Sequence, residues 1–130
     1  MPNASITPEL SLQPRQFKDK ANLLQFIRKQ IVNGTGKPLE TLLLEYSDIR
    51  RYQLALHYVT TTNKAVCSAM FIPIEAGTRY KATLEKNGYL VSSVDVFNCP
   101  VTGDKAHLLS TNPNEFVRLR KSRFNQLTIF

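Results

Sequence analysis

The sequence predicts an α+β fold: a small antiparallel or mixed sheet with a split β-α-β (ββαβ) unit, packed by an N-terminal amphipathic helix. Alternating apolar residues indicate strands at 52–60 and 65–74. A helical pattern follows at 78–86, and a valine-rich strand follows at 89–97. A hairpin, a crossover helix and a returning strand together make the split β-α-β unit.

The boundaries of this central unit come from turn and capping residues. The polar segment 61–64 has the length of a hairpin turn. Pro73 has no amide hydrogen for a sheet ladder, so the second strand is expected to end there. Thr78 is expected to cap the helix, and Asn87-Gly88 to end it, because glycine adopts the left-handed cap conformation readily.

Three further elements are predicted outside the central unit. Residues 15–33 form the clearest helix, since apolar residues recur there every three or four positions. Residues 39–46 favour a helix over a buried strand through Leu42–Leu44. Asn114 is expected to cap a short helix at 115–123, and the apolar end at 127–130 either adds an edge strand or inserts into a partner.

The chain divides into three parts. Residues 1–14 carry three prolines among polar residues and predict an extended arm. Residues 15–110 form a single α+β domain, because 130 residues suffice for one core. Residues 111–130 form a basic C-terminal helix or tail.

Composition restricts the class of protein. Apolar residues make up 42% of the chain and charged residues 21%, which favours a folded globular domain. No apolar run is long enough to span a bilayer, and residues 1–5 lack the features of a secretory signal, so a cytoplasmic location is expected. A net charge of +7 favours an anionic partner, which would be nucleic acid, an acidic protein surface or anionic lipid.

The titratable residues do not predict catalysis. Cys67 and Cys99 are expected to be buried free thiols, with a disulfide as the alternative. The cysteines and histidines lack zinc-site spacing, so neither a metal nor a cofactor is expected. His57 and His107 would suit acid-base cleavage of a phosphodiester, but nothing in the sequence brings them together. A small nuclease is therefore the third hypothesis, after two that involve no enzyme.

Basic and aromatic residues provide the candidate site. The residues predicted to bind an anionic partner are basic side chains from four segments: Arg118, Arg120, Lys121, Arg123, Arg28, Lys29, Arg50 and Arg51. The residues predicted to dock on a partner are apolar and lie near the C-terminus: Phe116, Phe124, Leu127, Ile129 and Phe130.

The leading functional hypothesis is a non-enzymatic adaptor or assembly protein that docks onto an acidic partner surface within a larger complex. The N-terminal arm and the apolar basic tail would dock by ordering on the partner. The alternative is a sequence-tolerant nucleic-acid-binding protein for RNA or single-stranded DNA, which would grip phosphates with arginines and stack bases on Phe116 and Phe124.

Overall fold

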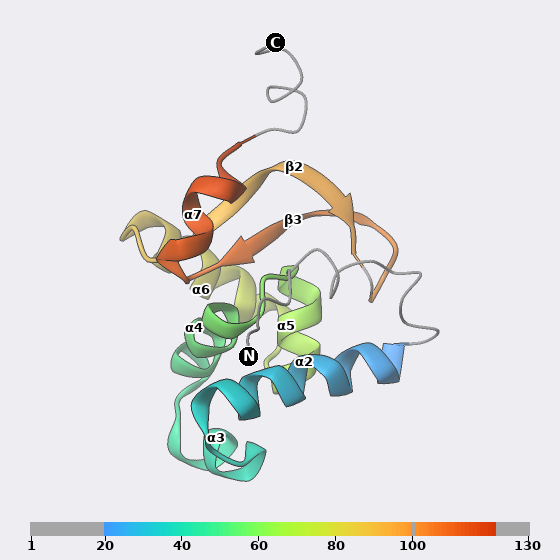
Figure 1. Ribbon diagram of the computed structural model, residues 1–130, viewed down its shortest axis with the longest axis vertical. Coiled ribbons are helices and arrows are strands. Elements are labelled where there is room, and N and C mark those ends of the chain that lie inside the picture. The colour runs from blue at the N-terminus through green and yellow to red at the C-terminus, as the bar shows by residue number, and fades with distance from the viewer. Residues whose placement is uncertain (1–19, 100, 122–130) are drawn as a thin grey trace.

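The computed structural model describes residues 20–99 and 101–121 (Figure 1). These residues form six helices and a two-stranded antiparallel sheet, which confirms the α+β class. In chain order the elements are α2 (Lys20–Thr35), α3 (Leu39–Glu45), α4 (Asp48–Tyr58), α5 (Asn63–Met70), α6 (Ile74–Lys86), β2 (Val91–Asn98), β3 (Lys105–Ser110) and α7 (Pro113–Leu119).

The strand predicted at 52–60 is wrong, because residues 52–58 belong to α4. The hydroxyl of Ser47 accepts a hydrogen bond from the amide of Arg50 at 3.4 Å and so caps the helix. Tyr52, Ala55 and Leu56 are buried with helical spacing. A strand would place Tyr58 on the same face as Tyr52, because side chains alternate along a strand, but Tyr58 is exposed.

The strand predicted at 65–74 is also wrong, because its first part is helix α5. Thr62, predicted to lie in a hairpin turn, instead caps this helix by accepting from the amide of Ala65 at 3.3 Å. Ala65, Val66, Ala69 and Met70 all face the core, and that spacing requires a helix. The split β-α-β unit is therefore absent from the described residues, whose named strands are β2 and β3.

Helix α6 begins earlier than predicted. It starts at Ile74 after Pro73, whose φ of −58° leads into a helical turn, so Thr78 lies inside the helix and is not its cap. The predicted end at Asn87-Gly88 is confirmed. Gly88 has a φ of +81°, and the amide of Tyr89 donates to the carbonyl of Leu84 at 2.9 Å.

The β2–β3 hairpin follows α6. The strand predicted at 89–97 is confirmed as β2, whereas β3 lies in a segment for which no strand was predicted. Between Ser92 and Val96 the register shifts, so β2 carries extra residues opposite Leu108. The hydroxyl of Ser93 accepts from the amide of Leu108 at 2.8 Å and keeps that amide paired within the irregularity.

Two contacts join the hairpin to the helices. Thr61 and Leu109 form an antiparallel bridge, in which the amide of Leu109 donates to the carbonyl of Thr61 at 2.8 Å. The hydroxyl of Ser110 donates to the carbonyl of Leu56 at the end of α4 at 3.2 Å. The hairpin is therefore fixed beside α4 and α5.

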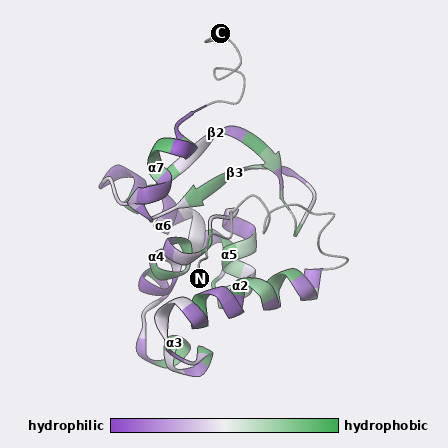
Figure 2. Cartoon of the chain, viewed as in Figure 1, coloured by the Kyte–Doolittle hydropathy of each residue, from purple (hydrophilic) through white to green (hydrophobic). Residues whose placement is uncertain are grey.

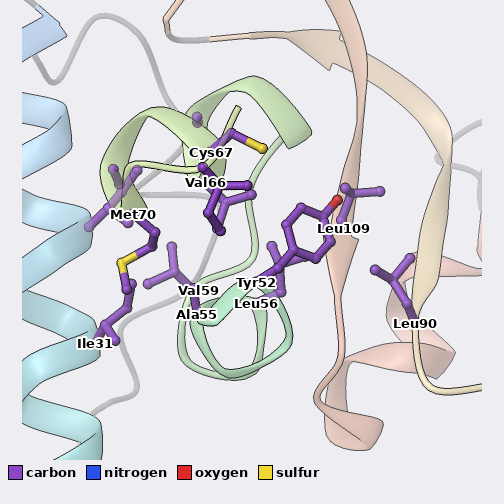
Figure 3. Close-up of a cluster of buried hydrophobic side chains, with 14 of the residues drawn as sticks. Ile31, Tyr52, Ala55, Leu56, Val59, Val66, Cys67, Met70, Leu90 and Leu109 are labelled. Carbon is purple, nitrogen blue, oxygen red and sulfur yellow. The ribbon is translucent and has the colours of Figure 1, made fainter. Parts of the chain in front are cut away.

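The main core lies among α2, α4, α5 and α6, with Leu90 and Leu109 added from the hairpin (Figure 3). Helix α2 contributes Leu23, Ile27 and Ile31. In Figure 2 its ribbon carries both hydrophobic (green) and hydrophilic (purple) residues. A second cluster lies between α7 and the hairpin and contains Val91, Leu108, Leu119, Phe97 and Phe116.

Both short helices predicted outside the central unit are present. The helix favoured at 39–46 is α3, whose Leu42 is buried. The helix predicted at 115–123 is α7, but it begins at Pro113, and its cap is Asn112, whose side chain accepts from the amide of Asn114. The predicted arm at 1–14 and the predicted apolar end at 127–130 lie outside the described residues.

Candidate nucleic-acid interface

Helices α5 and α6 pack against each other as consecutive helices, which is the connectivity of a helix-turn-helix. They are joined by a turn of three residues, Phe71 to Pro73. In DNA-binding proteins with this arrangement the second helix enters the major groove of the duplex, while the first helix crosses the backbone. Here the second helix is α6, which has 13 residues and carries most of its polar side chains on the surface.

The close approach of α6 to α5 depends on Gly77. A Cβ atom at this position would lie 2.2 Å from the sulfur of Cys67 and 2.9 Å from the side-chain oxygen of Asn63. The hydroxyl of Tyr52 donates to the same oxygen of Asn63 at 2.7 Å, which ties α4 to the start of α5. Burial raises the pKa of the Cys67 thiol to about 12, so this sulfur is neutral and packs as a small apolar group.

The turn has an unusual backbone. Phe71 has a φ of 59° and a ψ of 44°, a left-handed conformation that glycine adopts more readily. Arg28 of α2 supports this turn: its Nε donates to the carbonyl of Ala69 at 2.8 Å, and its guanidinium lies 4.7 Å from the centroid of the Phe71 ring. The end of α5 and the turn are therefore held by α2.

One stripe of α6 faces away from the core. Its members follow helical spacing, and all are exposed: Glu75, Thr78, Arg79, Ala82 and Lys86. The buried residues Ala76, Gly77 and Leu84 lie on the opposite side. Because Thr78 and Ala82 are small, they leave room for a surface to approach the helix axis. We call these five residues the α6 stripe.

The basic side chains of α6 differ in whether they already form an ion pair within the protein. Lys81 pairs with Glu85 at 3.1 Å, and Glu85 also accepts from the hydroxyl of Ser92 on β2 at 2.7 Å. Burial on its own raises the pKa of Glu85, but the hydrogen bonds from Ser92 and Lys81 and the charge of Lys81 outweigh it, so the pKa lies below its ordinary value. By contrast, Arg79 and Lys86 of the α6 stripe have no ion pair with any described residue.

The tip of the hairpin lies beside the start of α5 and the first turn of α6. A cavity of about 170 Å³ separates them, and Thr78 of the α6 stripe lines it. Two lysines also line it, Lys64 from α5 and Lys105 from β3. Lys64 lies 3.8 Å from Asp104 in a well-exposed pair, which contributes little to stability. Both lysines therefore line a cavity beside α6, and their side chains are accessible to solvent.

Cys99 fastens the hairpin tip to α5. Its sulfur lies 3.0 Å from the hydroxyl of Thr62, the residue that caps α5. Burial alone raises the pKa of this thiol, but hydrogen bonds from Thr62 and from the backbone of Thr102 and Val101 lower it below its ordinary value. Cys67 and Cys99 are both free and buried, as the sequence predicts.

The described basic residues that were predicted as a site lie on or just after three different helices, α2, α4 and α7. Arg118 on α7 pairs with Glu115 of the same helix. Arg120 lies over the ring of Phe116, 5.5 Å from its centroid, and Phe116 packs partly buried against the cluster under α7. Lys121 is exposed just after this helix. In Figure 1, α7 and α2 are well separated.

The other predicted basic residues have mixed roles. Arg51 is buried, and its guanidinium donates to the carbonyl of Tyr46 at 2.8 Å and to Asp48 at 2.6 Å, so it joins α3 to α4. Lys29 is exposed on α2. Arg50 is exposed and lines a groove of about 250 Å³ on α4. Five predicted site residues lie outside the described part of the chain: Arg123, Phe124, Leu127, Ile129 and Phe130.

The histidines have local partners. The ring of His57 packs edge-on against Tyr58 at 4.8 Å between centroids. His107 has its Nδ1 at 2.6 Å from the carbonyl of Ser93, so Nδ1 carries the proton that it donates. Among residues 20–99 and 101–121 no group of histidine, cysteine and acidic side chains is placed to hold a metal, and none of the helices there has the length and apolarity to cross a membrane.

Sequence reasoning missed the α6 stripe. None of the stripe residues is among the predicted site residues, because the segment before this helix was predicted to be a strand. The signal for two consecutive helices was nevertheless present, because Thr62 is a good helix cap and Pro73 favours the start of a second helix after it. No protein-family model, curated protein or solved structure matches this chain.

Proposed function

We propose that this protein is a non-enzymatic DNA-binding protein that places α6 in the major groove of double-stranded DNA. One observation carries the proposal: the helix-turn-helix of α5 and α6 presents a solvent-facing stripe in which Arg79 and Lys86 are unpaired among the described residues. The major groove of B-form DNA is wide enough to admit an α-helix, and it displays the edges of the bases to the side chains of that helix.

The shape of the interface favours duplex DNA over single strands. Binding of single-stranded nucleic acid relies on aromatic rings that stack on bases. The α6 stripe contains no aromatic residue, and Tyr80 of the same helix packs edge-on against Tyr52, 6.0 Å between ring centroids. A narrow convex stripe with short central side chains suits a groove, so RNA or single-stranded DNA is the weaker form of the nucleic-acid hypothesis.

Phosphate contacts would come from the cations around the stripe. Lys64 and Lys105 flank the first turn of α6 across the 170 Å³ cavity, and Lys86 is the last residue of α6. Each lysine that neutralises a phosphate releases condensed counterions, so affinity falls steeply as salt rises. The overall charge of +7 acts in the same direction by attracting the polyanion.

The test compares the affinity of the full chain for a random-sequence duplex with its affinity for the separated strands. Fluorescence anisotropy at several salt concentrations supplies both the affinity and the salt slope. We expect tighter binding to the duplex, and about a ten-fold or greater loss when Arg79→Ala and Lys86→Ala are combined. Lys20→Ala, an exposed lysine on α2, is the matched control and should lower affinity far less.

Other outcomes would favour the remaining hypotheses. If Arg118→Ala and Arg120→Ala weaken binding while the α6 double variant does not, the interface lies on α7. If the chain binds neither duplex nor single strands, the DNA-binding proposal fails. The adaptor hypothesis would then stand first, with an acidic protein surface as the partner.

A further inference from the structure

We propose that the α6 stripe reads DNA sequence, with Arg79 selecting guanine and Glu75 selecting cytosine on base pairs no more than two steps apart. This inference rests on the proposed function, because it names the bases that the same helix would meet in the major groove. It goes further in one respect: binding would depend on sequence, whereas the nucleic-acid hypothesis drawn from the sequence was sequence-tolerant.

The spacing of the two residues suits this task. Glu75 and Arg79 are four positions apart and lie in the N-terminal half of α6, the half that contacts base edges in helix-turn-helix proteins. Four residues of helix advance about 6 Å. Successive base pairs are about 3.4 Å apart, so the two side chains would reach pairs within two steps of each other.

Hydrogen-bonding capacity singles out the same two residues. The stripe residues in this half of α6 are Glu75, Thr78 and Arg79, and Ala82 lies just beyond it. Ala82 has no polar group, and the hydroxyl of Thr78 already donates to the carbonyl of Ile74 at 3.1 Å. Glu75 and Arg79 make no hydrogen bond or ion pair with any described residue. Their polar groups are therefore available to a ligand.

The chemistry of Arg79 points to guanine. Its planar guanidinium presents parallel donors that match the O6 and N7 acceptors of guanine, and no other base offers that pair in the major groove. A lysine would keep the charge but lose the paired geometry. Substitution of Arg79 by lysine therefore separates base reading from attraction to phosphate.

Glu75 is the stronger indication of specificity. A carboxylate on a helix that faces DNA is repelled by the phosphates, so it weakens binding to most sequences. It becomes favourable only where it accepts a hydrogen bond from a base amino group, and the N4 group of cytosine is such a donor. Glu75 is also in the first turn of α6, where the helix dipole favours an acid, and the test must separate that structural role from base reading.

The test is selection of duplexes from a randomised library by the full chain, followed by sequencing. Wild type should enrich a motif with a guanine and a cytosine no more than two base pairs apart. Arg79→Lys should keep duplex binding but lower the preference for guanine about ten-fold or more. Glu75→Gln should change the preferred base from cytosine to adenine, because glutamine pairs with adenine N6 and N7. Glu40→Gln, an exposed acid on α3, is the control and should leave the motif unchanged.

Each result has a separate meaning. If wild type binds duplexes but enriches no motif, or if Arg79→Lys and Glu75→Gln enrich the same motif as wild type, base reading is overturned while DNA binding stands. If wild type enriches no duplex at all and shows no anisotropy change, the proposed function itself is wrong. A purely structural role of Glu75 would lower the urea midpoint of Glu75→Gln without changing the motif.

Discussion

Arg28 and Phe71 are 43 positions apart in the chain, yet the guanidinium of Arg28 lies 4.7 Å from the centre of the Phe71 ring. The same guanidinium donates to the carbonyl of Ala69 in the last turn of α5. Phe71 occupies a left-handed conformation that costs about 1–2 kcal/mol for a residue with a side chain. Helix α2 thus supports the turn that sets the angle between α5 and α6.

The first prediction concerns this support. Arg28→Ala removes a charged hydrogen bond and a cation–π contact, so we expect the free energy of unfolding to fall by about 1–2 kcal/mol. Urea denaturation followed by circular dichroism measures the change. Lys29→Ala, at the exposed neighbouring position, should change stability by less than about 0.5 kcal/mol. Equal stability of the two variants would show that Arg28 does not support the turn.

The two wrong strands show why periodicity alone misled the sequence analysis. In the segment 52–60, residues at alternate positions are apolar, but so are residues three and four positions apart. Both patterns describe the same letters, and short apolar stretches cannot separate them. The structure resolves the conflict through the caps, because Ser47 and Thr62 each pair an amide that a helix start leaves open. Capping residues were the better guide here.

The close packing of α5 and α6 gives the second prediction. Gly77→Ala places a methyl group 2.2 Å from the sulfur of Cys67, so the helices must separate or strain. Overpacking of this kind costs about 1–3 kcal/mol. Removing the sulfur with Cys67→Ala should restore part of the loss, and the double variant should be more stable than the sum of the two single changes predicts.

Urea denaturation of wild type, the two single variants and the double variant measures this coupling. Strictly additive changes would mean that the Cys67 sulfur is not the atom that limits the approach of α6. The contact between Asn63 and Gly77 would then be the remaining explanation, since the oxygen of Asn63 lies 2.9 Å from the same added atom.

The third prediction is a pH dependence. Burial raises the pKa of Cys67 from its ordinary value of 9.0 to about 12. Between these two values the unfolded chain has lost a proton that the folded chain keeps, so stability is full below pH 9 and falls as pH rises toward 12. One such group lowers the free energy of unfolding by about 1.4 kcal/mol per pH unit in that window.

The measurement is urea denaturation at pH 8 and at pH 10.5 for wild type and Cys67→Ala. Tyr52 has a raised pKa from burial and acts in the same direction, so wild type and variant should both lose stability. The loss should be smaller in Cys67→Ala. Parallel losses in the two proteins would contradict the raised pKa of Cys67.

The candidate site was harder to predict than the fold class. Composition indicated an anionic partner, but it could not say which of the basic residues face that partner. Arg51 illustrates the difficulty: it reads as a surface cation next to Arg50, yet it is buried and joins α3 to α4. Arg79 reads as an unremarkable surface residue, and only the position of α6 after a tight turn gives it a role.

The last prediction concerns the hairpin tip. Lys105 on β3 and Lys64 on α5 line the cavity beside Thr78, so a duplex that receives α6 would bring phosphates to both ammonium groups. Because each phosphate contact contributes about one unit to the slope of log affinity against log salt, Lys105→Ala should reduce that slope by about one. It should weaken binding to all sequences alike, whereas Arg79→Lys changes the preference among sequences.

The slope is measured by anisotropy titrations at salt concentrations from about 50 to about 200 mM, because phosphate contacts change the affinity strongly over that range. Lys20→Ala on α2 should leave it unchanged, and a slope that is equally unchanged in Lys105→Ala would place the hairpin tip away from the DNA.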